Sequence, residues 1–229
     1  MADTETTPIL VIGNKNYSSW SLRPWLLLTQ LGIPFTEVRL PLDTPEFAEK
    51  IGQWSPTGRV PVLRHGRLTV WDSFAICEYA NDVLAPGRGW PADPPTRAHA
   101  RSVCAEMHSG FMALRNELPM NCRARGRRVQ RSAACEADLQ RIYSSWRVCR
   151  QHYGDGGPWL FGAFSIADAM YAPVALRLLT YDVSRDAVVQ AYIDALLALP
   201  ALQAWLAAAQ AETEVVEADE AGETDPARS

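Results

Sequence analysis

The sequence has no long apolar run. The longest candidate, residues 195–209, is interrupted by Pro200 and Gln203 and falls short of the roughly 18 residues that cross a membrane. The first eight residues do not place a basic segment before an apolar one, as secretory signals do. We therefore expect a cytoplasmic protein that does not bind membranes.

Cysteine and histidine are sparse. The five cysteines are odd in number and form no C-x-x-C pair. Neither they nor the four histidines have the spacing of metal ligands. Reduced thiols in a cytoplasm fit this pattern better than a disulfide framework or a zinc site. We expect no bound metal.

Lysine is almost absent, because 20 of the 22 basic residues are arginine. Residues 211–229 hold seven acids and one arginine, and the rest of the chain holds 19 acids and 21 bases. We interpret residues 211–229 as a disordered or loosely packed acidic tail. We expect a basic cluster to form a solvated loop and the start of a helix. Its members are Arg123, Arg125, Arg127, Arg128 and Arg131. Nucleic-acid binding would need a basic domain with interleaved aromatic residues, and neither is present.

The first third of the chain alternates strand and helix patterns. Residues 8–12 and 35–40 are expected strands, joined by a helix from Leu22 to Leu31 with Ser21 as its N-cap. Strand, helix and strand within about thirty residues form a βαβ unit, so these two strands should be parallel. An irregular stretch rich in proline follows.

A hairpin and a helix complete this part. Two short apolar runs around His65-Gly66 predict a β-hairpin, and residues 74–84 predict a helix with Ser73 at its N-cap. The predicted order is β-α-β-β-β-α.

The remainder is predicted to be helical. Residues 86–95 are rich in proline and glycine and indicate a linker between a first domain at 1–85 and a helical domain at 96–210, followed by the tail at 211–229. We expect helices at Thr96–Leu118, at Val129–His152, from Ser165 onward, at 186–199 and at 201–210. The fold class is thus α/β followed by all-α.

Three motifs carry a resemblance to a known family. They are Ser18-Ser19-Trp20-Ser21-Leu22-Arg23, then Ser55-Pro56-Thr57-Gly58-Arg59-Val60-Pro61-Val62-Leu63 with Trp71-Asp72-Ser73-Phe74-Ala75-Ile76, and Phe164-Ser165-Ile166-Ala167-Asp168. Together with the layout they resemble the cytosolic glutathione transferases, in particular bacterial members of the serine type, as in the zeta and tau classes. The resemblance implies a thioredoxin-like domain followed by the family's helical domain, in which Ser165 and Asp168 form a structural capping box.

The resemblance also implies a glutathione site. Pro61 would be cis, and Val60 would offer its backbone to the cysteinyl part of glutathione. Ser73 and the N–H groups of its helix would take the γ-glutamyl carboxylate, and Asp72 the ammonium. Arg59 could pair with the glycyl carboxylate. The structural alternatives are a trans proline, a simple N-cap and an exposed loop arginine.

Ser18 is the expected contact of the glutathione thiol, and Ser19 is the adjacent alternative. A serine hydroxyl is too weak a base to take the thiol proton, but it can donate a hydrogen bond to the thiolate. Trp20 stands where the zeta class has cysteine, which favours conjugation, or no chemistry, over isomerisation. Candidate lining residues of the electrophile pocket are Trp20, Met107, His108 and Phe111, although such a stripe is more often core.

The resemblance implies an enzyme of detoxification that conjugates the glutathione thiolate to small apolar electrophiles and forms a homodimer. An alternative function is a scaffold of the same fold that binds a protein partner without catalysis. A glutaredoxin-like thiol–disulfide enzyme ranks last, because the start of the first helix holds serines where that chemistry needs a cysteine of low pKa.

Overall fold

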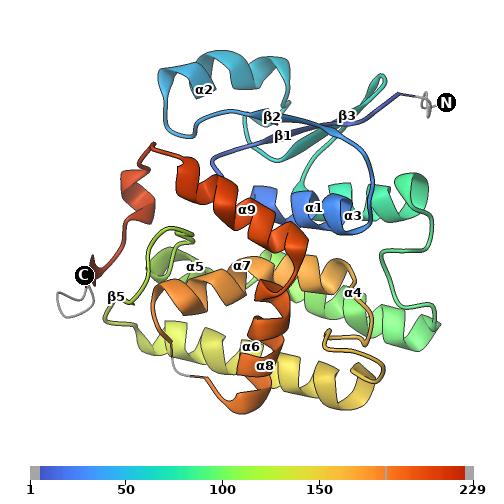
Figure 1. The fold of residues 1–229 in the computed structure, drawn as a ribbon, viewed down its shortest axis with the longest axis vertical. Coiled ribbons are helices and arrows are strands. Elements are labelled where there is room, and N and C mark those ends of the chain that lie inside the picture. The colour runs from blue at the N-terminus through green and yellow to red at the C-terminus, as the bar shows by residue number, and fades with distance from the viewer. Residues whose placement is uncertain (1–5, 184, 225–229) are drawn as a thin grey trace.

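The computed structural model describes residues 6–183 and 185–224, and it places a small sheet above a larger group of helices (Figure 1). Strand β1 (Ile9–Ile12) pairs in parallel with β2 (Thr36–Arg39) and antiparallel with β3 (Val62–His65), which pairs antiparallel with β4 (Leu68–Val70). The sheet order is β2-β1-β3-β4. The predicted parallel βαβ unit and the hairpin are therefore confirmed.

Both faces of the sheet are covered. Alternate residues of β1 point to opposite faces, so Leu10 and Ile12 join the main core while Val11 joins a second, smaller cluster. The main-core face packs on α1 (Ser19–Gln30) and α3 (Ser73–Tyr79), and Figure 1 shows both beneath the sheet. On the opposite side lies α2 (Pro45–Lys50). The start of α1 is thereby held between the sheet and the helical half.

Three local predictions in this half are corrected. Helix α1 is capped by Ser18, because the hydroxyl of Ser21, the predicted cap, instead accepts the Gly13 N–H at 3.1 Å. Helix α3 is capped by Asp72, and Ser73 is its first residue. The stretch expected to be irregular contains α2, which Thr44 caps, and a 3-10 turn at Ile51–Gln53. The five residues after α3, Ala80–Leu84, form a π-helical turn.

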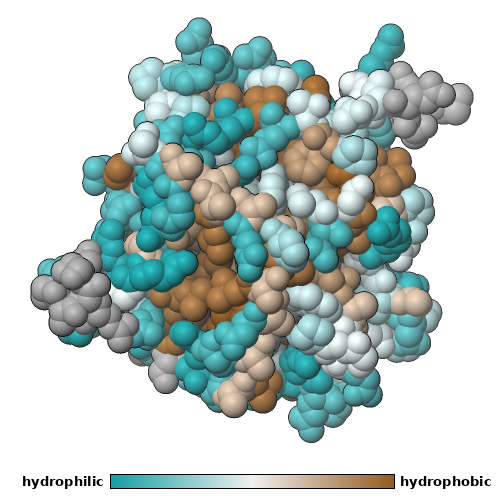
Figure 2. All heavy atoms as spheres, in the orientation of Figure 1, coloured by the Kyte–Doolittle hydropathy of each residue, from teal (hydrophilic) through white to brown (hydrophobic). Residues whose placement is uncertain are grey.

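The second half consists mainly of helices. They are α4 (Pro94–Ser109), α5 (Met112–Glu117), α6 (Ala133–Tyr153), α7 (Ile166–Thr180), α8 (Ala187–Leu197) and α9 (Pro200–Ala211). Helix α7 is almost wholly buried and packs against α1 and α4. In Figure 2 an apolar area lies over α7, and polar residues surround it. The exact domain boundaries at 85 and 96 stay a prediction.

The helix expected at Thr96–Leu118 is in fact two helices. Helix α4 ends at Ser109 and is capped by Gly110, where a Cβ atom would lie 2.9 Å from the Glu106 carbonyl oxygen and clash with it. Phe111 then takes a left-handed φ of 59° and is the N-cap of α5. The chain turns here because two consecutive residues leave helical geometry.

The capping box at the start of α7 is confirmed. Asp168 is fully buried and accepts the N–H groups of Ser165 at 2.8 Å and Leu160 at 3.0 Å, and the Tyr192 hydroxyl at 3.0 Å. Burial raises the pKa of Asp168 to about 6, although these hydrogen bonds lower it. The box ties the loop before α7 and helix α8 to one carboxyl group.

The acidic tail is not loosely packed over the residues that the structure describes. Residues 212–224, here called the C-terminal segment, leave α9 and run down the side of the molecule (red in Figure 1). Its β6 (Glu223–Thr224) pairs with β5 (Arg127–Arg128). The basic cluster is likewise not simply solvated, because Arg123 and Arg127 bind this segment. The last five residues of the predicted tail lie outside the described residues.

No single helix among the described residues is long and apolar enough to cross a membrane. Helices α8 and α9 pass that test only as a pair, and they are bent by 75° at their junction.

Candidate active site

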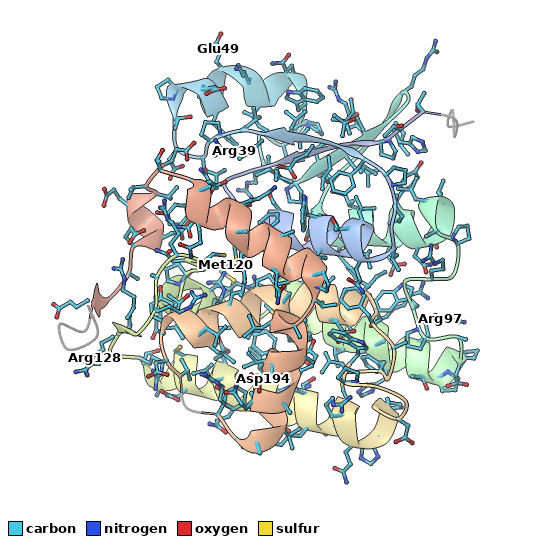
Figure 3. The ribbon with its side chains drawn as sticks, in the orientation of Figure 1. Arg39, Glu49, Arg97, Met120, Arg128 and Asp194 are labelled. Carbon is cyan, nitrogen blue, oxygen red and sulfur yellow. The ribbon has the colours of Figure 1, made fainter. Side chains whose placement is uncertain are left out.

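Two adjoining cavities meet at the start of α1. The proline cavity, of about 300 Å³, is lined by Trp20, Thr57, Arg59, Val60, Pro61, Trp71, Asp72 and Ser73. The arginine cavity, of about 390 Å³, is lined by Tyr17, Ser18, Ser19, Trp20, Leu42, Phe47, Gly58, Arg59, Val60, Arg115, Pro119, Met120, Arg177 and Asp219. Met120, labelled in Figure 3, lies left of centre, where the two halves of the molecule meet. Trp20, Arg59 and Val60 are shared by both cavities.

The loop before β3 shapes the proline cavity. The Val60–Pro61 peptide bond is cis, as the resemblance implies. Ser55 holds the loop, since its hydroxyl accepts the N–H groups of Thr57 at 3.3 Å and Arg59 at 3.1 Å. The Arg59 side chain is exposed at the rim of both cavities.

Both carboxylate oxygens of Asp72, which lines this cavity, have partners outside it. One carboxylate oxygen caps α3 by accepting the N–H groups of Phe74 at 3.1 Å and Ala75 at 3.4 Å. The other oxygen lies 2.9 Å from Nε2 of His108 on α4. Ser73 is buried beside it, and its hydroxyl accepts a long hydrogen bond from Arg23 at 3.5 Å.

The two candidate thiol contacts differ in how their hydroxyl groups are used. Ser18 donates its hydroxyl hydrogen to the Ser21 hydroxyl at 2.7 Å and accepts the Ser21 N–H at 3.4 Å. Ser19 accepts a hydrogen bond from the Arg177 guanidinium at 3.1 Å. Among the described residues Ser19 has no acceptor for its own hydroxyl hydrogen, so that hydrogen is available to a ligand.

Three guanidinium groups surround the start of α1. Trp20 lies between Arg23, 4.2 Å from its ring centroid, and Arg115, at 4.9 Å. Burial, and then repulsion from Arg115 and Arg177, lowers the pKa of Arg23 to about 9. Burial followed by Arg115 lowers the pKa of Arg177 to about 10. These cations stay charged at neutral pH, and a nearby anion would relieve their repulsion.

Two nitrogens of Arg23, Nε and Nη2, are buried without a hydrogen-bond partner among the described residues. This is a costly arrangement for a cation in the interior. The fold therefore satisfies the hydrogen-bonding groups of Arg23 only in part, while its positive charge adds to the potential at the start of α1.

The other predicted lining residues are not brought to either cavity. Met107 and Phe111 are buried in the main core. His108 lines neither cavity, but its ring packs edge-on against Trp20 at 5.4 Å while it binds Asp72. Helix α4 therefore supports the site from behind.

The sequence analysis missed four polar or charged residues of the arginine cavity: Tyr17, Arg115, Arg177 and Asp219. Arg177 had a usable signal, because it is the one basic residue in the apolar sequence of α7. Asp219 had none, because it lies in the segment expected to be loosely packed.

The cysteines do not serve this site. All five are buried and free, and none lines either cavity. Burial raises the pKa of Cys122 to about 12, which suppresses the reactive thiolate. Among the described residues no group of three or more possible metal ligands occurs.

Comparison with known proteins agrees with this geometry. The sequence model of the glutathione S-transferase N-terminal domain matches residues 17–83, and that of the C-terminal domain matches residues 130–208. Together they span more than half of the chain.

Individual relatives are more distant. Maleylacetoacetate isomerase of Rattus norvegicus is 29% identical over 110 residues, which are 48% of this chain and 51% of the relative. Dichloromethane dehalogenase of Methylorubrum extorquens is 36% identical over 63 residues, 27% of this chain and 22% of the relative. The chain thus spans about half, or less, of the curated relatives it matches.

A solved structure covers much more of the chain. A glutathione transferase homolog from Burkholderia with bound glutathione is 26% identical, has a TM-score of 0.68 and covers 90% of this chain and 99% of its own. With both domain matches in place, the chain belongs to the glutathione S-transferase superfamily.

Proposed function

We propose that the protein binds glutathione in the proline cavity and conjugates its thiolate to a small apolar electrophile held in the arginine cavity. The observation that carries this proposal is the position of Ser19, which lines the arginine cavity, accepts a hydrogen bond from Arg177 and directly precedes Trp20, a residue that both cavities share. A thiol that reached from the proline cavity past Trp20 would meet this hydroxyl.

Residues of the proline cavity suit the tripeptide. The backbone of Val60 before the cis Pro61 would pair with the cysteinyl part, as the family resemblance implies. Ser73, the first residue of α3, would take the γ-glutamyl carboxylate, and Asp72, which already accepts the N–H groups of Phe74 and Ala75, would take the ammonium. Because Asp72 already contacts His108, the ammonium would either share the Asp72 carboxylate with the His108 imidazole or displace that imidazole. Arg59, exposed at the rim, is free to follow the glycyl carboxylate.

The surroundings of Ser19 favour a thiolate. A free thiol has a pKa of about 8.5, so at neutral pH it is mostly protonated. Ser19 would donate its hydroxyl hydrogen to the sulfur, and the nearby guanidinium groups would stabilise the negative charge. The thiol proton leaves to solvent. The thiolate then attacks an electrophilic carbon, and the leaving group departs with its bonding electrons.

Conjugation is favoured over isomerisation as the reaction. Trp20 fills the position at which the zeta class has cysteine, although one relative is named as an isomerase. The second substrate is proposed to be small and largely apolar, to match Leu42, Phe47 and Met120. A role in detoxification, a cytoplasmic location and a homodimer are proposals that rest on the family alone.

Titration calorimetry with glutathione, followed by conjugation of 1-chloro-2,4-dinitrobenzene, tests the proposal. We expect binding in the millimolar range or tighter, and turnover that Ser19→Ala reduces while Ser102→Ala, on the exposed side of α4, does not. An absence of binding at millimolar glutathione would remove the enzymatic proposal and favour the scaffold alternative.

A further inference from the structure

The C-terminal segment, residues 212–224, contributes a wall of the arginine cavity. It lies beyond both matched family domains, the second of which ends at residue 208. Its Asp219 is nevertheless one of the residues that line the cavity together with Ser18, Ser19 and Arg177. A segment outside the matched domains thus brings an acidic group to the place proposed for the electrophile.

The segment is anchored ahead of Asp219. The Glu212 carboxylate accepts the N–H groups of Lys15 at 2.8 Å and Asn16 at 3.0 Å. Arg39, labelled in Figure 3, forms an ion pair with Glu214 at 2.7 Å. The Arg123 guanidinium donates to the Glu214 carbonyl at 2.7 Å. These contacts tie the segment to the loop that precedes α1, to the end of β2 and to the loop between α5 and β5.

It is anchored again directly after Asp219. Glu220 accepts hydrogen bonds from the Tyr17 hydroxyl at 2.7 Å and from Asn121 at 2.8 Å, and it pairs with Arg127 at 2.5 Å. The short strand pair β5–β6 follows. Asp219 is therefore held from both sides, and its position does not depend on a free chain end.

The charge of Asp219 stands alone in the cavity. The other charged lining residues, Arg59, Arg115 and Arg177, are all cations. Among the described residues no group donates a hydrogen bond to the Asp219 carboxylate, and no cation lies within ion-pair distance of it. Arg177 acts on it through space and lowers its pKa, but burial prevails and raises that pKa to about 6.

We propose that Asp219 is a specificity-determining residue, which disfavours electrophiles that carry a carboxylate and favours neutral ones. Its negative charge offsets that of Arg177, so an acidic ligand gains little from the arginine and is repelled by the aspartate. A neutral ligand that donates a hydrogen bond can instead use the unpaired carboxylate. The proposal rests on the proposed function only for the statement that the ligand is an electrophile.

A pair of matched probes tests this inference by kinetics. We compare 4-chloro-3,5-dinitrobenzamide with 4-chloro-3,5-dinitrobenzoate, which differ only in that a carboxylate replaces the neutral amide at the carbon opposite the reacting one. Asp219→Asn should raise kcat/KM for the benzoate about tenfold relative to the neutral probe. Glu217→Gln is the matched control, because Glu217 is exposed and begins the short 3-10 turn Glu217–Asp219 that ends at Asp219, so this variant removes the same charge and should leave the ratio unchanged.

A binding measurement keeps the test independent of catalysis. Calorimetry with 4-nitrobenzoate and neutral 4-nitrobenzamide should show the same selective gain for the acid in Asp219→Asn and in Asp219→Ser. Thermal unfolding confirms that both variants are folded. An unchanged ratio, an equal change for both probes, or no binding of either probe to any variant would overturn the inference. If the protein does not conjugate either electrophile but the Asp219 variants still bind the acid more tightly relative to the amide, the result would contradict the proposed function and leave this inference intact.

Discussion

The starts of α1 and α7 use the same local device for different ends. Each helix begins after a serine whose hydroxyl accepts a backbone N–H, Ser18 in α1 and Ser165 in α7. At α7 the surrounding groups satisfy one another through Asp168, and the start is closed in the core. At α1 the next residue, Ser19, faces a cavity with a hydroxyl hydrogen to spare. A fully satisfied helix start serves the fold, whereas one left partly unsatisfied is available to a ligand.

The largest effect on stability should come from a substitution at the buried start of α7. Asp168→Ala removes the carboxylate that accepts from four buried donors, namely the Leu160 N–H, the N–H and hydroxyl of Ser165, and the Tyr192 hydroxyl. We expect the free energy of unfolding to fall by about 3 kcal/mol, measured by chemical denaturation. Asp93→Ala, at the exposed cap of α4, is the control and should cost about 1 kcal/mol. Equal losses for the two variants would contradict the comparison.

Removing the Ser19 hydroxyl at the start of α1 should lower activity with little loss of stability. Ser19→Ala takes away the proposed donor to the thiolate, so kcat/KM for 1-chloro-2,4-dinitrobenzene should fall about 100-fold. Ser18→Ala should instead cost about 1 kcal/mol of stability, because that hydroxyl caps α1. Steady-state kinetics and denaturation of both variants separate these roles, and a larger kinetic loss in Ser18→Ala would reverse our assignment.

The arginine behind Ser19 sharpens the same comparison. Arg177→Gln removes a positive charge near the proposed thiolate, so the pKa of bound glutathione should rise by about one unit. The ultraviolet absorbance of the thiolate, followed against pH, measures it. Arg101→Gln, which lies on α4 and pairs with Glu78 away from both cavities, should leave that pKa unchanged. No difference between the two variants would rule out an electrostatic role for Arg177.

The smallest expected effect is a pH dependence of ligand choice. Below about pH 6 Asp219 becomes protonated, so the wild-type preference against 4-nitrobenzoate should weaken severalfold and approach that of Asp219→Asn. The charged groups that act on Asp219 are Arg177, Asp43 and Glu220. Calorimetry at pH 5 and pH 7.5 checks this. A shift of equal size in the Asp219→Asn variant would assign the effect to another of these groups.

Local patterns were sufficient for the framework of the fold and for the proline cavity. Each of these motifs can be recognised from a few consecutive residues, because turns and helix caps depend on local sequence. They are Val60-Pro61, Asp72-Ser73 and the capping box at Ser165. Helix α2 was missed although Thr44 and Pro45 form an ordinary helix start, since it is only six residues long.

The arginine cavity could not be predicted in the same way. Arg177 and Asp219 come from segments more than 150 residues away from Ser19, and only the packing of α7 and of the C-terminal segment brings them together. The charge of residues 211–229 suggested solvation, but Glu214 forms an ion pair with Arg39 and Glu220 forms one with Arg127. Long-range ion pairs of this kind leave no periodic trace in a sequence.

One indole ring forms part of the partition between the two cavities. Because Trp20 borders both, a substitution there should change the affinity for both proposed substrates at once. Ser73 and Met120, by contrast, each border a single cavity and allow one affinity to be altered alone. A redesign of substrate preference can therefore alter one cavity alone through Ser73 or Met120, whereas a substitution of Trp20 alters both cavities together.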